Sequence, residues 1–187
     1  IPWWTTDIGG FFGANINDPE FHELLVRWFE YGCFCPVMRL HGYRWPLQPQ
    51  YGTTGGATCV SGAPNEVWSY TDQVCEILSD YLRLRERMLP YITELMEEAH
   101  EKGTPVMRPL FYDFPEDKES WNVETEYMFG PKVLVKPITD ADARETDVYL
   151  PGGASWTNAW TGETFEGGQK VHVAAPIEQI PLFTRDG

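Results

Sequence analysis

The chain has 187 residues, enough for one ordinary domain or two small ones, and 14% of them are aromatic. Its net charge of −14 argues against nucleic acid as a partner, because nucleic acid requires a basic surface. This charge is compatible with a neutral or cationic partner, or with solubility alone. The sequence does not predict a membrane span, because no apolar run approaches the ~18 residues that a span needs.

The first eleven residues have the composition of an active-site loop. They read I-P-W-W-T-T-D-I-G-G-F and carry a single charge, at Asp7. Glycine lacks a Cβ, so Gly9 and Gly10 let the backbone turn sharply and approach a ligand closely. Because this run starts at Ile1, without a methionine or a leader, we expect a piece of a longer protein, and no compartment is predicted.

A first helix is predicted from position 19. Asp18 is a suitable N-cap, Pro19 fits the first helical position, and Gly32 is expected to end the helix. Apolar side chains recur at helical spacing between these limits: Phe21, Leu24, Leu25, Trp28 and Phe29.

A short buried strand is predicted over residues 35–42, with polar side chains at its end. Barrel enzymes place ligand-bearing loops after buried strands, so a site is expected where this strand ends. Arg39 and His41 lie two residues apart and therefore on one face of the strand. Residues 43–69 are rich in Gly, Pro, Thr and Gln and are predicted to form a long loop, which is either functional or poorly ordered.

A long helical segment follows over residues 71–102, where apolar side chains form a broad stripe at helical spacing. Pro90 lacks a backbone donor and should kink or split this helix. Gly103 and then Pro105 are expected to stop it.

After position 103 the pattern changes to strands and turns. The strand candidates are residues 106–111, 132–138, 146–150, 170–174 and 180–183. Their spacing predicts an antiparallel sandwich or part of one. The fold class is therefore α/β over residues 1–103, followed by an all-β domain over residues 104–187.

The four cysteines do not indicate a metal centre. Cys33 and Cys35 are closer in sequence than zinc ligands usually are. Buried free thiols are the favoured interpretation. A disulfide between Cys59 and Cys75 stays open at this point.

Asp7 and His41 are the candidate functional residues. Asp7 either caps a turn through its own backbone or accepts hydrogen bonds from vicinal sugar hydroxyls, with Trp4 and Phe11 as apolar walls. A lone histidine is more often structural, but Arg39 beside His41 could hold a carboxylate in a polar network. The other three histidines are interpreted as surface or packing residues: His22, His100 and His172.

No catalytic machinery is evident in the residues themselves. The sequence has no G-x-S-x-G motif, no phosphate loop and no H-E-x-x-H motif. Glycoside hydrolysis requires two carboxyl groups across the scissile bond, and no convincing second carboxylate stands near Asp7 in the sequence.

An ordered set of motifs resembles glycoside hydrolase family 31. The motifs are W-T-T-D-I-G-G-F at residues 4–11, M-R-L-H-G at 38–42, G-T-P-V-M-R-P-L at 103–110, Y-M-F-G at 127–130 and Y-L-P at 149–151, before Trp156. Because the set spans nearly the whole chain, the resemblance is specific.

The resemblance implies retaining α-glycosidases built on a (β/α)8 TIM barrel with β-sandwich domains. Residues 1–103 would hold the last strands and helices of the barrel, with D-I-G-G-F after strand seven and R-L-H-G after strand eight. Residues 104–187 would form the proximal C-terminal antiparallel β-sandwich.

The resemblance also implies roles for individual residues. Asp7 and His41 would contact the sugar in the cleaved subsite, while Ile8 and Phe11 would line it. Trp4 would belong to the same wall less directly, and Arg39 would be supporting. The nucleophile and the acid/base would lie upstream, so no catalytic residue is expected in this chain. Neither a cofactor nor a metal is implied.

We therefore expect part of an α-glycosidase that hydrolyses terminal α-xylosidic or α-glucosidic bonds, with the D-I-G-G-F and R-L-H-G forms favouring α-xylosidase. The alternative is an inert structural or carbohydrate-binding fragment, in which Trp156 and Trp160 are core residues or a sugar platform. The expected partners are an oligosaccharide and the rest of the enzyme. A quarter barrel exposes strand edges and apolar helix faces, so an isolated chain should be a homo-oligomer, marginally stable or part of a larger assembly.

Overall fold

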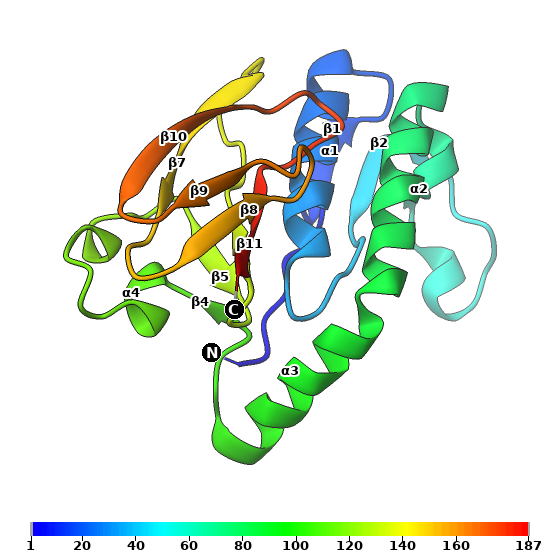
Figure 1. The fold of residues 1–187 in the computed structure, drawn as a ribbon. Coiled ribbons are helices and arrows are strands. Elements are labelled where there is room, and N and C mark those ends of the chain that lie inside the picture. The colour runs from blue at the N-terminus through cyan, green and yellow to red at the C-terminus, as the bar shows by residue number, and fades with distance from the viewer. Residues whose placement is uncertain (1, 187) are drawn as a thin grey trace.

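An antiparallel sheet stands between a group of helices and a second, two-stranded sheet in the computed structural model (Figure 1). The structure describes residues 2–186, so Ile1 and Gly187, the outer ends of the two predicted segments, lie outside the described residues. In chain order the elements are β1 (Phe12–Asn15), α1 (Pro19–Cys33), β2 (Tyr43–Gln48), β3 (Ser61–Ala63), α2 (Asp72–Arg87), α3 (Leu89–Lys102), β4 (Met107–Arg108), α4 (Leu110–Asp113), β5 (Tyr127–Phe129), β6 (Val133–Val135), β7 (Glu145–Leu150), β8 (Ser155–Asn158), β9 (Thr164–Glu166), β10 (Gln169–Ala174) and β11 (Leu182–Asp186).

The three long helices follow their local sequence signals. The side chain of Asp18 accepts a hydrogen bond from the Glu20 amide and caps α1, which continues one residue past Gly32. The predicted break at Pro90 is confirmed, because α2 ends at Arg87 and α3 begins at Leu89. Gly103 ends α3 in the left-handed conformation, with φ of 71°, a region that glycine enters without steric cost.

The main sheet has strand order β4-β5-β6-β11-β8-β9, and β7 pairs with β10 in the second sheet. Because successive strand residues point to opposite faces, the central strands serve two cores. Met128, Leu134 and Phe183 join the core shared with β7 and β10. Their neighbours face the core shared with the helices: Phe129, Val135 and Leu182. The main sheet therefore packs on helices with one face and on β7–β10 with the other.

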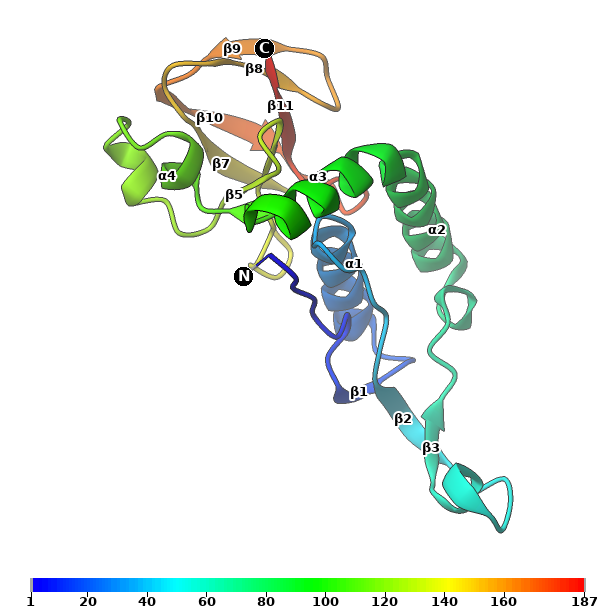
Figure 2. The ribbon, with the colours of Figure 1, turned by 90° about the horizontal axis from the view of Figure 1, so that it is seen from below.

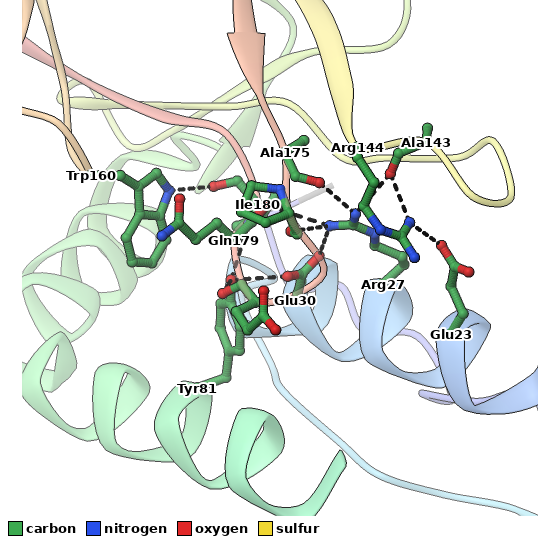
Figure 3. Close-up of polar contacts among 12 residues, drawn as sticks. Glu23, Arg27, Glu30, Tyr81, Ala143, Arg144, Trp160, Ala175, Gln179 and Ile180 are labelled. Atoms are coloured by element: carbon green, nitrogen blue, oxygen red, sulfur yellow. Dashed lines mark hydrogen bonds and ion pairs between the residues drawn. The ribbon is translucent and has the colours of Figure 1, made fainter. Parts of the chain in front are cut away.

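A buried polar cluster ties α1 and α2 to the segment between β10 and β11 (Figure 3). Arg27 lies at its centre and donates to Glu30 Oε2 at 3.1 Å. The Arg27 guanidinium also donates to four backbone carbonyls at 2.7–3.4 Å: those of Ala143, Ala175, Pro176 and Gln179. The Tyr81 hydroxyl lies 3.1 Å from Glu30 Oε1 and accepts from the Ile180 amide at 3.0 Å.

Burial dominates the electrostatics of this cluster. It raises the pKa of Glu30 to about 8, although the Arg27 charge and its hydrogen bond act in the opposite direction. The same desolvation, together with the nearby Glu30, raises the pKa of Tyr81 far above its usual range. Desolvation thus favours the neutral form of each group, while the neighbouring Arg27 favours the charged form of Glu30.

The strand predicted over residues 35–42 is absent from the structure, apart from one parallel bridge between Leu40 and Ile8. At the start of this segment, a side chain from a distant helix takes the backbone acceptors. Arg85 of α2 donates to the carbonyls of Cys33 and Cys35 at 2.7 Å and to that of Pro36 at 2.8 Å, so these acceptors serve a guanidinium instead of a strand ladder.

The loop predicted over residues 43–69 contains regular structure. β2 pairs in parallel with β1 and antiparallel with β3. Residues 43–63, which hold β2, β3 and the turn between them, extend away from the helices and form what we call the arm (Figure 2). Two short 3-10 turns, Gly55–Thr58 and Val67–Ser69, complete the segment. In β2 the side chains alternate between exposed Tyr43, buried Arg44 and exposed Trp45.

The β region also differs in detail from the prediction. The strand expected over residues 106–111 stops at Arg108, because Pro109 precedes the short helix α4. β5, β8 and β9 were not among the strand candidates. Trp156 on β8 is fully buried in the core between the sheets, which excludes it as a sugar platform.

All four cysteines are free thiols. Cys33 and Cys35 are buried as predicted, and burial raises the pKa of each to about 12. Cys59 is exposed, contrary to the expectation of burial, and Cys75 is intermediate. Cys59 lies just beyond a 3-10 turn of the arm, which has no buried residue to pack against it.

Candidate functional site

Two segments far apart in sequence lie side by side and form the site. The Ile8 amide donates to the Arg39 carbonyl at 3.2 Å, next to the bridge between Ile8 and Leu40. Further back, the Val37 amide donates to the Trp4 carbonyl at 3.0 Å. This backbone pairing places the side chains that flank Ile8 beside those that flank Leu40.

Asp7 forms an ion pair with Arg39 across these two segments. The Asp7 side chain is 25% exposed and that of Arg39 is 49% exposed, so a ligand in solvent can reach both. The turn after Asp7 is closed by its backbone carbonyl, which accepts from the Gly10 amide at 2.8 Å. The carboxylate itself therefore faces Arg39 instead of capping the turn.

His41 and Phe11 form a second pair of exposed residues at the same place. Their ring centroids are 5.6 Å apart with the planes tilted by 38°. The Phe11 carbonyl accepts from the Tyr43 amide at 3.1 Å, which fixes Phe11 against the segment that carries His41. A cationic and anionic pair thus stands next to an imidazole and an apolar ring.

Trp4 and Ile8 occupy different environments. Trp4 is partly exposed and meets Tyr31 edge-on, with centroids 5.9 Å apart. Ile8 is fully buried in the helical core, where it fills the space above Gly32. The Ile8 side chain therefore anchors the loop from the inside and is not exposed beside Asp7.

Glycines allow the two segments to approach each other. Gly42 has φ of 117°, and a Cβ at this position would overlap the carbonyl oxygens of Gly10 and Phe11. A Cβ at Gly9, where φ is 82°, would overlap the Arg44 guanidinium. Side chains at either position would push the Asp7 segment away from the His41 segment.

Arg44 supports the site from beneath, and sequence reasoning missed it. Its side chain is fully buried, lies over the Phe21 ring at 5.2 Å and donates to the Ile8 carbonyl at 3.4 Å. A buried cation holds the backbone next to Asp7. The sequence carried no signal for it, because the alternation Tyr43-Arg44-Trp45 favours inward aromatic rings and an outward arginine, the reverse of what the structure shows.

A large cleft lies elsewhere. It has a volume of about 1470 Å³ and runs between α1 and the β region, reaching Thr6 but neither Asp7 nor His41. Its α1 side carries Leu24, Trp28 and Tyr31. The Asp7 site is an exposed rim, and it is separate from this cleft because neither Asp7 nor His41 lines the cleft.

Among residues 2–186, no three His, Cys, Asp or Glu side chains are grouped so that they could hold a metal ion. Within the same residues, every helix is too short or too polar to cross a membrane.

Comparison with known proteins identifies relatives along the whole chain. Residues 1–95 match the TIM-barrel domain of glycosyl hydrolases family 31, and residues 103–187 match the C-terminal domain of that family. An α-xylosidase from Saccharolobus solfataricus is 38% identical over all of this chain, which covers 23% of that protein. α-Glucosidase 2 from Bacillus thermoamyloliquefaciens is 36% identical over 97% of the chain, or 20% of its own length.

Among solved structures, a family 31 α-xylosidase from a soil metagenome, complexed with xylose, is 50% identical with a TM-score of 0.94. The match includes 100% of this chain and 28% of the α-xylosidase chain. The chain thus spans about a quarter of the length of these relatives. Residues 1–95 and 103–187 together account for nearly all of the sequence, and the chain belongs to glycoside hydrolase family 31, as part of its TIM barrel followed by its C-terminal domain.

Proposed function

We propose that this chain is part of a retaining α-glycosidase that hydrolyses terminal α-xylosidic or α-glucosidic bonds. Residues 1–103 would be the last strands and helices of the barrel, and residues 104–187 the proximal β-sandwich. The observation that carries the proposal is the Asp7–Arg39 ion pair, exposed beside His41 and Phe11. A carboxylate, an imidazole and an aromatic ring on one rim are suited to a sugar.

Each side chain has a task in this proposal. Asp7 accepts hydrogen bonds from sugar hydroxyls, and such bonds to a charged group are stronger than neutral ones. His41 provides a further hydrogen-bonding atom, and Phe11 packs against the apolar face of the ring. Arg39 orients the Asp7 carboxylate through their ion pair. Trp4 extends the apolar wall, and Ile8 holds the loop from the core.

These residues bind and do not carry the covalent chemistry. Retaining hydrolysis proceeds through a glycosyl–enzyme intermediate formed by one carboxylate while a second donates and then accepts a proton. We place both of those carboxylates in the upstream part of the enzyme. Hydrogen bonds from Asp7 and His41 accelerate the reaction only to the extent that they tighten in the transition state.

Within this class we favour an α-xylosidase over an α-glucosidase. The 50% identity to an α-xylosidase complexed with xylose supports that preference, while the related α-glucosidase supports the alternative. The test is kcat/KM of the full-length enzyme on an α-xyloside and on the matching α-glucoside. Higher kcat/KM on the glucoside would overturn the substrate assignment, and turnover of neither would overturn the proposed function.

The isolated chain is proposed to be inactive, because it would lack the nucleophile and the acid/base. The large cleft beside α1 is then a surface for the remainder of the enzyme. We expect no hydrolysis of p-nitrophenyl α-glycosides by the chain alone. Turnover above background that is abolished in Asp7→Ala would contradict this expectation.

A further inference from the structure

A strip of exposed aromatic rings begins at the Asp7 site and continues along the arm. We define the aromatic strip as Phe11, Phe12, Tyr43 and Trp45, which are each between 42% and 68% exposed. Exposed aromatic rings gathered in one place are unusual on a soluble surface and mark binding sites. The roles proposed above use Phe11 alone and leave the other three rings without a task.

Sheet pairing aligns the rings of the strip. Phe12 of β1 pairs in register with Tyr43 of β2, and their rings stack with centroids 6.2 Å apart and planes 23° apart. Phe11 meets Phe12 edge-on at 6.0 Å and meets His41 at 5.6 Å. The contacts are therefore continuous from His41 to Tyr43.

Trp45 extends the strip along β2. Tyr43 and Trp45 are exposed while Arg44 between them is fully buried, so the two rings share the outer face of the strand. From His41 to Trp45 the backbone covers about 13 Å at the usual strand rise. The arm that carries this face extends away from the helices (Figure 2).

The chemistry of the strip suits an uncharged ligand with flat apolar faces. All four side chains are apolar or aromatic, and the tyrosine hydroxyl adds one polar tip. Pyranose rings present faces of C–H bonds that pack on aromatic rings, whereas their hydroxyls point outward. An oligosaccharide is uncharged and meets no repulsion from a chain of net charge −14, while a second copy of the chain does.

We propose that the aromatic strip binds the leaving-group side of an oligosaccharide whose terminal sugar lies at Asp7 and His41. This inference rests on the proposed function and deepens it, because it assigns longer oligosaccharides as the preferred substrates. Phe11 and Phe12 meet the units nearest the cleaved bond, and Tyr43 and Trp45 meet the more distant units. The arm then sets chain-length preference without touching the cleaved sugar.

The test uses the full-length enzyme and substrates that differ only in the leaving group. A glycosyl fluoride of the accepted sugar has a one-atom leaving group that cannot reach Phe12, Tyr43 or Trp45. Oligosaccharides of increasing length that end in the same sugar have leaving groups that can reach these rings. The variants are Trp45→Ala, Tyr43→Ala and the conservative Trp45→Phe, with Trp68→Ala as matched control, because Trp68 is 72% exposed but lies outside the strip.

We expect Trp45→Ala and Tyr43→Ala each to lower kcat/KM on the longer oligosaccharides by roughly 3- to 10-fold, as for other aromatic contacts. kcat/KM on the fluoride should stay unchanged, which also shows that the variants are folded. Trp45→Phe should keep most of the wild-type value on the longer substrates, and Trp68→Ala should behave as wild type throughout.

The outcomes separate this proposal from the one on which it rests. Suppose that the enzyme turns over the fluoride normally and that the effect of Trp45→Ala does not depend on oligosaccharide length. This result would overturn the role of the aromatic strip and leave the proposed function intact. No fluoride turnover by the wild type overturns the proposed function, and the strip with it. Sedimentation that shows a dimer in the wild type and a monomer in Trp45→Ala would assign the strip to a second copy instead.

Discussion

Two arginine–carboxylate pairs occupy opposite environments in this molecule. Arg27 and Glu30 have side chains that are 6% and 0% exposed, and they lie between the helices and the β region (Figure 3). Arg39 and Asp7 are 49% and 25% exposed and lie on the rim that we assign to sugar binding. The same two functional groups thus connect domains in one place and face solvent in the other.

Burial explains why the two pairs have different tasks. Charges removed from water need compensating hydrogen bonds, and the two terminal nitrogens of Arg27 meet four backbone carbonyls in addition to Glu30. A solvent-exposed pair contributes little to stability and keeps its hydrogen-bonding capacity for a ligand.

The largest effect is expected for Arg27→Met. The substitution leaves Glu30 buried without its cation and removes the donor to four carbonyls. The free energy of unfolding should fall by about 3–5 kcal/mol, the usual result of breaking a buried pair from one side. Urea denaturation measures it, with Arg83→Met in the exposed Arg83–Asp80 pair as control. Equal losses in both variants would show that burial is not decisive.

Glu30→Gln should change how stability depends on pH. Burial holds the pKa of Glu30 in the folded state at about 8, against an ordinary value of 4.5, so the folded state binds this proton more tightly than the unfolded state between these two pH values. The contribution of Glu30 is fully present below pH 4.5 and is lost as pH rises through 8, by at most about 1.4 kcal/mol per pH unit. The measurement is the unfolding free energy of wild type minus Glu30→Gln at pH 5 and pH 8. A difference that grows with pH would contradict the assignment.

Asp7→Asn should impair function more than folding. It removes the charged acceptor from the rim, and a hydrogen bond to a charged group contributes about 1.5–3 kcal/mol. In the full-length enzyme kcat/KM should therefore fall roughly 10- to 100-fold. The melting temperature serves as the control and should barely move. Wild-type kinetics in this variant would remove Asp7 from the proposed site.

The smallest effect on stability is expected for Arg39→Met. Because this side chain is half exposed, the unfolding free energy should change by no more than about 1 kcal/mol. kcat/KM should fall less than in Asp7→Asn, since Arg39 acts through the carboxylate. A loss of stability comparable to that of Arg27→Met would erase the distinction between the two pairs.

Local signals predicted the helices well. Asp18, Pro90 and Gly103 act on their immediate backbone neighbours, so their effects are readable from a few residues of sequence. The strand expected at residues 35–42 is reduced to one bridge at Leu40, and Arg85, some fifty positions away, takes the carbonyls of Cys35 and Pro36 at its start. Side chains that arrive from a distant element leave no trace in local patterns.

The candidate site also depends on contacts between residues that are far apart in the sequence. Residue type, position and then motif resemblance selected Asp7, Arg39 and His41, but no spacing rule predicts that Asp7 and Arg39 pair across 32 positions. Nor does residue type separate Ile8 from Phe11, although one is buried above Gly32 and the other is exposed. Arg44 was overlooked because its role depends on the pairing of β1 with β2.

The contact between Arg27 and the β region is made with main-chain oxygens. Ala143, Ala175, Pro176 and Gln179 all contribute carbonyls, which every amino acid carries. Side chains at these four positions can therefore drift during evolution while the docking is preserved, provided that the backbone path is kept. Homologous enzymes should tolerate substitutions in this segment but not insertions or deletions, because a change of length would move the acceptors away from the guanidinium.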